Sequence, residues 1–529
     1  MNFTTQIEST IKNIKEKLTI QQLTAFAAVL IAGLCAHGYV FFNRISYHDN
    51  SADIFALGGT YESGRWALGF IYDIQMLTSK LFAVPVFNGL LSVIFIAIAA
   101  MLVVDMFKIK SRVFSAYIGI IMVVYPVVTS IFSFMFTAWE YFLALLLSVV
   151  AARSLYKGLT VKNFVISVVA LTFSLGLYQA FMAFTIAALL FKLYLDVVNR
   201  QVEDVITYIK HGFIYLAEIL LSLGLWAVMK KLTQAIKGIS AVAYKGMDEG
   251  YDLSQFPAKL IGSVKAFFGF GQAGINAVLY LRAFTALIVI IGIVQIFWLL
   301  FTSRQKMGVK LISLVGLALL PIAMNVVYIL STSSDYKVDS LMVYGDIFVF
   351  IIPAVLIEIF EFTHGNSTAL TKWLGVATWL QLACLFVMLV GYIYLDNAAY
   401  LKGEIAVEQA TAYFTELAAN IKSTEGFSDD MEIVFVGCDY LDDGTNAKID
   451  KIDQFEAIQL EKYPRFTDII TYGGSIYFMQ EHVGFGSDTL SYDDGTLAAD
   501  PQVQAMPTYP NDGAIAIIDG KVIVKLGEE

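Results

Sequence analysis

Charged residues are scarce in this chain of 529 residues. They make up 15% of the sequence, whereas hydrophobic residues make up 58%; soluble domains carry roughly 25% charged residues. Runs of about 18 or more apolar residues recur, and a helix of that length, at about 1.5 Å per residue, crosses a hydrocarbon core of roughly 30 Å. The composition excludes an ordinary soluble globular protein and predicts a polytopic α-helical membrane protein.

Cysteine is also rare, and several enzyme motifs are missing. Cys35 and Cys384 lie within apolar runs and Cys438 stands alone near the C-terminus, so no disulfide framework is available. The sequence has no P-loop, GxGxxG, HExxH or nucleophile elbow in a suitable setting, which leaves cytosolic nucleotide chemistry unsupported. The stretch 439–444 is similar to a calcium loop, but Leu441 occupies a ligand position and Asp450 replaces the closing Glu. We therefore expect a turn there, and neither metal nor cofactor.

Eleven membrane spans are predicted, at about 19–42, 82–105, 113–130, 134–152, 163–178, 180–197, 208–229, 283–302, 309–330, 343–361 and 373–395. Alternation of sides collects the N-terminus and the short basic loops at 108–112, 153–162, 192–210, 304–310 and 361–372 on one side. The positive-inside rule makes that side cytoplasmic. The loops 43–81 and 230–282 are then external, and amphipathic stretches at 234–244 and 259–270 are expected to lie on the membrane surface.

The charges divide the chain into unlike parts. Residues 397–529 contain 24 acidic and 8 basic residues and carry a net charge of −16, whereas the rest of the chain carries +6. We expect an amphipathic cytoplasmic segment at 1–18, a transmembrane domain at 19–396 and a small extracytoplasmic α/β domain at 397–529. In this last domain the sequence predicts a helix at 407–421, a strand at 431–437 and a hairpin at 513–525, whose turn is Asp519-Gly520.

Asp49 is the strongest catalytic candidate. It lies in the triplet His48-Asp49-Asn50, directly after the first apolar run. If the outer loop binds a sugar linked to a lipid phosphate, the leaving phosphate is a weak base, and one carboxylate near the acceptor hydroxyl suffices as general base. Asp53 and Glu62 are nearby acids for binding substrate, and His48 is a hydrogen-bonding neighbour. The alternative is that Asp49 caps a helix or closes a turn.

Other polar residues at the expected outer surface are candidates for substrate binding. The guanidinium of Arg65 suits a departing phosphate, and Arg282 is a further candidate for the same role. The alternative is that Arg65 anchors a helix at the lipid headgroups. Glu140 lies near the outer end of a span, where a charge is costly unless it is paired or faces a wet cavity. Tyr178 and Gln179 occupy a tight outer turn and face the same alternatives, a polar contact to substrate or a structural role.

Five short motifs carry a family resemblance: His48-Asp49-Asn50, Gly64-Arg65-Trp66, Trp139-Glu140-Tyr141, Leu177-Tyr178-Gln179-Ala180 and the stretch 506–513. With them the chain resembles the Gtr-type (serotype-converting) bacterial membrane glucosyltransferases of the GT-C superfamily. The resemblance implies an inverting enzyme of the bacterial cytoplasmic membrane. It would move glucose or another hexose from a polyprenyl-phosphate donor to a surface polysaccharide or other envelope glycopolymer on the outer face, with the carboxylate of Asp49 as the catalytic residue. Family members often have two adjacent acids, whereas Asn50 follows Asp49 here, which leaves Asp53 or Glu62 as the partner.

Two other functions compete with this one. A transporter or flippase of a lipid-linked sugar would also have many spans, but such proteins commonly contain internal repeats and midplane polar sites. Here no repeat is evident, and the polar residues crowd the outer surface. A non-catalytic sensor or assembly scaffold would account for the C-terminal domain, although its acidity disfavours binding of anionic polymers.

Overall fold

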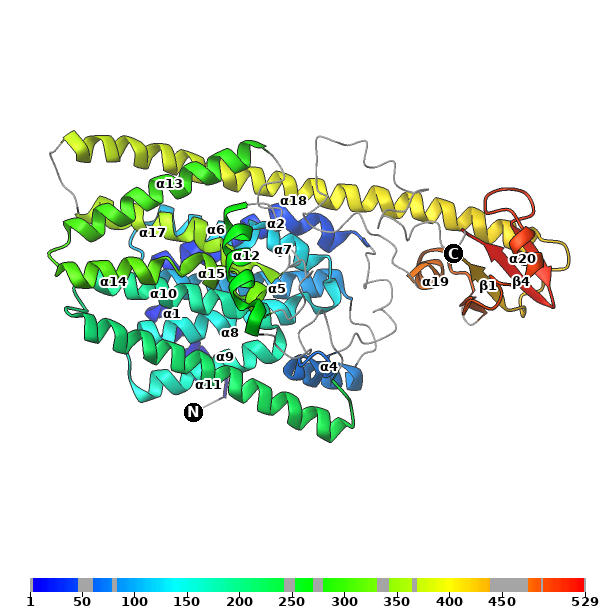
Figure 1. Cartoon of the computed structure of the whole chain (residues 1–529), viewed down its shortest axis with the longest axis horizontal. Coiled ribbons are helices and arrows are strands. Elements are labelled where there is room, and N and C mark those ends of the chain that lie inside the picture. Colours follow the sequence, from blue (N-terminus) through cyan, green and yellow to red (C-terminus); the bar gives the residue numbers. More distant parts are fainter. Residues whose placement is uncertain are drawn as a thin grey trace.

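A helical bundle and a small sheet domain make up the part of the chain that the computed structural model describes, which is residues 3–45, 60–78, 83–241, 253–269, 279–330, 342–363, 369–437, 474–486 and 489–527. The bundle is elongated, and one long helix, α18 (Ala369–Ser423), runs from it into the sheet domain (Figure 1). His48, Asp49, Asp53 and the stretch 439–444 lie outside the described residues. We call the end of the bundle from which α18 leaves the sheet-side end.

The long helices of the bundle are α2 (Ile20–Phe42), α5 (Pro85–Phe107), α6 (Arg112–Val124) with α7 (Pro126–Phe132), α8 (Ala138–Tyr156), α9 (Val161–Leu177), α10 (Met182–Val198), α11 (Val205–Lys237), α13 (Leu279–Thr302), α14 (Met307–Leu317) with α15 (Leu320–Met324), α17 (Phe348–Thr363) and α18. Within the described ranges, nine helices are long and apolar enough to cross a membrane. The predicted number of eleven is not confirmed, because α9 and α17, at two expected spans, have only 17 and 16 residues.

Shorter helices complete the bundle: α1 (Phe3–Lys17), α4 (Trp66–Thr78), α12 (Phe256–Gly269) and α16 (Val326–Leu330). The expected surface helix at 259–270 corresponds to α12, which lies across the direction of the long helices (Figure 1) and packs on α15 and α16. The expected surface helix at 234–244 does not begin as a separate element, since residues 234–237 are the end of α11. That helix continues past the predicted end of its span and reaches the sheet-side end.

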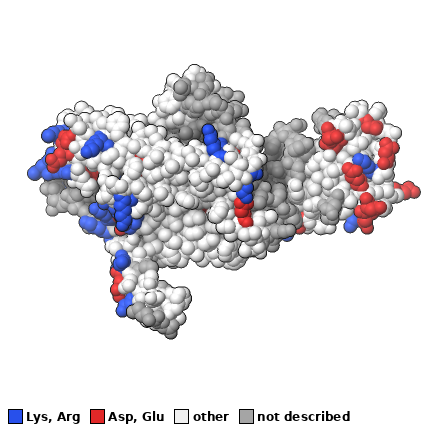
Figure 2. Space-filling view, turned by 90° about the horizontal axis from the view of Figure 1, so that it is seen from below, with Lys and Arg blue, Asp and Glu red and all other residues white. Residues whose placement is uncertain are grey.

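Polar caps fix where several membrane helices begin. The side chains of Thr19, Ser111, Thr160 and Asp204 each accept a hydrogen bond from the backbone N–H three residues later. Each cap satisfies one of the N–H groups that the first helical turn leaves without a partner. Lys and Arg gather on the surface at the end of the bundle opposite the sheet domain, whereas Asp and Glu predominate on the sheet domain (Figure 2).

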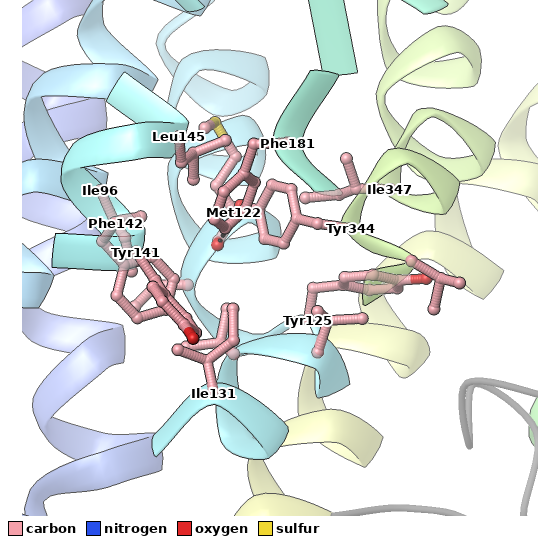
Figure 3. Packing of buried hydrophobic residues seen from close by; sticks show 14 of the residues in the cluster. Ile96, Met122, Tyr125, Ile131, Tyr141, Phe142, Leu145, Phe181, Tyr344 and Ile347 are labelled. Atoms are coloured by element: carbon pink, nitrogen blue, oxygen red, sulfur yellow. Dashed lines mark hydrogen bonds between the residues drawn. The ribbon is translucent and has the colours of Figure 1, made fainter. Parts of the chain in front are cut away.

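Aromatic side chains fill the core where the helices converge (Figure 3). Tyr344, in the short helix η5 (Tyr344–Ile347), packs edge-on against Phe181 at 5.5 Å between ring centroids and against Tyr125 at 6.0 Å. Its hydroxyl donates to the carbonyl of Met122 at 2.7 Å. This bond satisfies a buried polar group that would otherwise destabilise the core, and it fixes η5 against α6.

Buried polar contacts hold α18 to the bundle. The Nε2 of His37 lies 2.7 Å from the carbonyl of Val123, and its Nδ1 lies 2.7 Å from the hydroxyl of Tyr400. Because a carbonyl only accepts, Nε2 carries the proton, and the Nδ1 of a neutral ring accepts from Tyr400. Thr129 donates to Asp396 at 2.6 Å. These contacts set the position from which α18 leaves the bundle.

Among its described residues the sheet domain has four strands in the order β2-β1-β4-β3, formed by β1 (Ile433–Val436), β2 (Leu490–Tyr492), β3 (Ile515–Ile518) and β4 (Lys521–Lys525). β1 is parallel to β2 and β4, with Ile433 paired with Leu490 and Val522, and β3 and β4 form an antiparallel hairpin. Three short helices belong to this domain: α19 (Gly474–Phe478), the π-helix η7 (Met479–Val483) and α20 (Pro501–Ala505). The predicted strand and hairpin are confirmed.

The predicted helix at 407–421 is confirmed, but it is not a separate element. These residues are the last third of α18, which has 55 residues, and no proline interrupts it. Its residues Phe414, Leu417 and Ile421 are buried. Phe414 packs against Phe478 of α19 at 5.6 Å between ring centroids, and Asn420 donates to the hydroxyl of Tyr509 at 3.1 Å. The expected domain boundary at 397 therefore falls inside a continuous helix.

Candidate functional site

Arg65 follows a tight turn at the sheet-side end. The N–H of Arg65 donates to the carbonyl of Thr60 at 2.8 Å, and the N–H of Gly64 donates to that of Tyr61 at 3.1 Å. The helix α4 begins at the next residue, and its Trp66 is buried edge-on against Phe173 of α9 at 5.2 Å. The turn and the buried tryptophan together fix the backbone from which the Arg65 side chain projects.

Two stacked tyrosines face the Arg65 guanidinium. The rings of Tyr141 and Tyr178 are nearly parallel, with centroids 4.0 Å apart. The guanidinium carbon lies 5.7 Å from the first ring and 5.4 Å from the second, within the range of a cation–π interaction. One guanidinium nitrogen also donates to the Tyr141 hydroxyl at 2.9 Å. These contacts orient a planar cation whose fork of donors matches the oxygens of a phosphate.

Glu140 is a fully buried carboxylate beside this group. It lies in the first turn of α8, directly before Tyr141, and its side chain is 0% exposed. One of its oxygens accepts a hydrogen bond from Gln75 of α4 at 3.3 Å, and the other is buried without a hydrogen-bond partner in the described part of the chain. A buried carboxyl oxygen without a donor is costly, and such a group in a membrane span is a candidate for a functional role.

The extension of α11 holds the turn in place. Trp226 donates from its indole nitrogen to the carbonyl of Gly64 at 3.0 Å, and Gln234 donates to the carbonyl of Tyr61 at 2.8 Å. Lys237, at the end of the helix, pairs with Asp73 of α4 at 2.6 Å. These three α11 residues face the same direction because helical residues three, four or eight positions apart share one face. The last turns of α11 thus position Arg65 indirectly.

Asp73 is ionised in this arrangement. Burial alone would raise its pKa, but hydrogen bonds from Lys237 and Tyr61 hold the pKa of Asp73 below its ordinary value. The pKa of Tyr61 is raised by burial and by its bond to this carboxylate. Tyr61 therefore stays protonated and donates to Asp73, which holds the turn against α4, while the ion pair of Asp73 with Lys237 joins α4 to α11.

Two features of Gly64 favour glycine, its positive φ and the close approach of neighbouring side chains, and a pair of variants separates their effects on stability. Its φ is +77°, and an added Cβ would lie 2.9 Å from the Trp226 ring and 3.0 Å from the Lys230 side chain. Gly238 also has a positive φ, of +67°, but an added Cβ would meet nothing within 4 Å. We expect both Gly→Ala variants to lose roughly 1 kcal/mol from backbone strain, and Gly64→Ala to melt at a lower temperature than Gly238→Ala. Tryptophan fluorescence during heating measures this difference, and equal melting would contradict the close contact.

A pocket opens at the same end, between the end of α2 and the start of α5. It has a volume of about 270 Å³, and its walls include Phe41, Phe42, Phe132 and Met135. Arg44 and Glu481 lie at its mouth, and the Nε of Arg44 donates to the Glu481 carboxylate at 3.0 Å. Glu481 belongs to η7, so the pocket combines the bundle and the sheet domain. Burial, followed by the charge of Arg44, lowers the pKa of His482 to about 4, so this neighbour is neutral at physiological pH.

The structure brings together most of the described candidates. Glu62 lies in the turn before Arg65, and its carbonyl accepts from Gln234 at 3.4 Å. Tyr178 ends α9, and Gln179 begins the short helix η2 (Gln179–Phe181) and donates to the carbonyl of Ser63 at 3.3 Å. Of the predicted residues, Tyr178 contacts the Arg65 guanidinium, and Glu140 directly precedes Tyr141, which also contacts it. Arg282 is apart from them: it is exposed on α13, which packs mainly on α18 and α17.

Several residues of this site were not predicted. Tyr141 was part of a recognised motif, but nothing in the sequence indicates that its ring stacks on Tyr178. Gln75 and Asp73 lie on α4, which was expected only as part of an outer loop. In the described ranges no group of three His, Cys, Asp or Glu side chains is placed to hold a metal ion.

Comparison with known families gives one match. The family model described as "Glucosyl transferase GtrII" matches residues 38–350, which include Arg65, Glu140 and Tyr178. Searches among curated proteins and among solved structures find no match to the chain.

Proposed function

Because the chain belongs to the GtrII glucosyl transferase family and is a membrane glycosyltransferase, we propose that it takes glucose or another hexose from a polyprenyl-phosphate donor. The acceptor would be a surface polysaccharide or another glycopolymer of the cell envelope. The reaction would occur on the outer face of the bacterial cytoplasmic membrane, with the N-terminus inside and the sheet domain outside. The clustering of Lys and Arg at the end opposite the sheet domain supports this orientation.

The observation that carries the donor assignment is the fixed guanidinium of Arg65. Its contacts with the stacked Tyr141 and Tyr178 orient a cation at the bundle end where a lipid headgroup would lie. As the anomeric carbon–oxygen bond breaks, negative charge develops on the departing polyprenyl phosphate, and a preoriented cation stabilises that charge. The buried carboxylate of Glu140 would accept a hydrogen bond from a sugar hydroxyl.

Asp49 supplies the base in this mechanism. Its carboxylate takes the proton of the acceptor hydroxyl while that oxygen attacks the anomeric carbon from the side opposite the phosphate. One carbon–oxygen bond forms and one breaks, so the product is the inverted glycoside, and polyprenyl phosphate leaves with the electron pair. Asp49 lies between Arg44 and Arg65 in the sequence.

Purified protein tests this proposal. Given polyprenyl-phosphate glucose and the surface polysaccharide extracted from cells that lack the gene, it should release polyprenyl phosphate and transfer glucose to the polymer. A flippase would instead move the lipid across vesicles with its glycosidic bond intact. Lipid movement without bond cleavage would therefore contradict the transferase.

A further inference from the structure

The pocket at Arg44 and Glu481 has the two kinds of surface that bind a sugar ring. The C–H groups on one face of a pyranose pack against aromatic side chains, and here the exposed ring of Phe42 supplies such a face, with the buried Phe41 and Phe132 in the pocket wall. Its hydroxyl groups need donors and acceptors, which Arg44 and Glu481 supply at the mouth. We propose that this pocket binds a sugar unit of the acceptor glycan; this inference rests on the glycosyltransferase function proposed above.

Glu481 is built into the pocket as a buried carboxylate. Its side chain is 2% exposed, whereas that of Arg44 is 56% exposed. A carboxylate withdrawn from water is costly unless it is paired, and the guanidinium of Arg44 provides that pairing. Glu481 also lies on a π-helix, a rare element that is frequent at functional sites. A paired but buried carboxylate at a pocket mouth is a strong acceptor for sugar hydroxyls.

The pocket adjoins the Arg65 site through one short segment. Met135 lines the pocket and begins the helix η1 (Met135–Thr137), which leads directly into α8. The first turn of α8 carries Glu140 and Tyr141, and Tyr141 contacts Arg65. The wall of the proposed acceptor pocket is thus continuous in the chain with the segment that contacts Arg65.

Size and lining distinguish this pocket from a site for a lipid chain. A volume of about 270 Å³ is near the lower limit of ligand pockets, roughly 300 Å³, and suits a single sugar unit. The groove between α13 and α18 is lined by apolar side chains and by Tyr280 and Tyr394, and its described lining has no charged side chain. An isoprenoid chain has no polar groups, so it would favour that apolar groove over a pocket whose lining includes the ion pair of Arg44 and Glu481.

Steady-state kinetics of the full-length protein test the proposal. The donor is polyprenyl-phosphate glucose, and the acceptor is the polysaccharide extracted from cells that lack the gene. We expect Glu481→Gln and Arg44→Gln each to raise the KM for polysaccharide about tenfold, the effect of one lost hydrogen bond to a charged group, with the KM for donor unchanged. Ala83→Phe fills the pocket from its wall without touching the ion pair, and should raise the same KM. Glu432→Gln is the matched control, since it breaks the exposed pair with Lys521 in the same domain.

The outcomes separate this proposal from the proposed function. Slow release of glucose to water, measured without polysaccharide, reports donor chemistry alone, and Glu432→Gln should release glucose at the rate of the unaltered protein. If the variants change the KM for donor instead, the pocket holds donor and the proposal is overturned. If they behave like Glu432→Gln, the ion pair is only structural and the proposal is likewise overturned. An unaltered protein that cleaves no donor would refute the transferase itself.

Discussion

Replacement of Asp49 by Asn is expected to lower kcat by about 10²- to 10⁴-fold, the usual contribution of a positioned general base. The amide keeps the size of the carboxylate but cannot take the proton of the acceptor hydroxyl. The KM for donor should change little, because Arg65, rather than Asp49, would hold the phosphate. Transfer of glucose from polyprenyl-phosphate glucose to polysaccharide, measured at saturating donor, gives this result directly.

A folding defect must be separated from the loss of chemistry. Asp429→Asn makes the same chemical change at an exposed position of the sheet domain and should leave kcat unaltered. Both variants should elute and melt like the unaltered protein. If folded Asp49→Asn turns over at the normal rate, Asp49 is not the base, and Asp53→Asn and Glu62→Gln become the variants to measure.

Replacement of Arg65 by Gln has the second largest expected effect, a loss of about 10²- to 10³-fold in kcat. This is the range found when one preoriented group that stabilises transition-state charge is removed. The guanidinium faces the rings of Tyr141 and Tyr178, so its orientation is already set before substrate binds. Arg65→Lys keeps the charge but loses the planar fork, and its activity should lie between those of Arg65→Gln and the unaltered protein.

The matched control for this series is Arg304→Gln, an exposed position beyond the end of α13. It should transfer glucose at the normal rate. Equal activity of the Arg65→Gln and Arg304→Gln proteins would contradict the assignment of Arg65 to the departing phosphate. If Arg65 only anchored the turn, Arg65→Gln would lower the melting temperature in proportion to its loss of activity. Arg65→Lys would then restore neither the melting temperature nor the activity.

Local patterns in the sequence predicted several elements correctly. Apolar runs long enough to cross a membrane located most helices, since length and hydropathy are properties of each segment alone. The Asp519-Gly520 turn between two β-prone runs predicted the β3–β4 hairpin, because the positive φ of both residues suits a tight two-residue turn. The parallel strand β2 was not predicted. Its pairing with β1 joins residues that are distant in the chain, and three residues give too little pattern.

What the sequence by itself determined is the class of protein, the family and the candidates Arg65, Glu140, Tyr178 and Gln179, because these depend on composition and on short motifs. Only the tertiary structure decided which of them meet. The stacking of Tyr141 on Tyr178 under Arg65, the bond from Gln75 to Glu140 and the contact of Arg44 with Glu481 all join residues from separate helices or domains. Such contacts depend on how helices pack against one another, and no spacing within one segment records that packing.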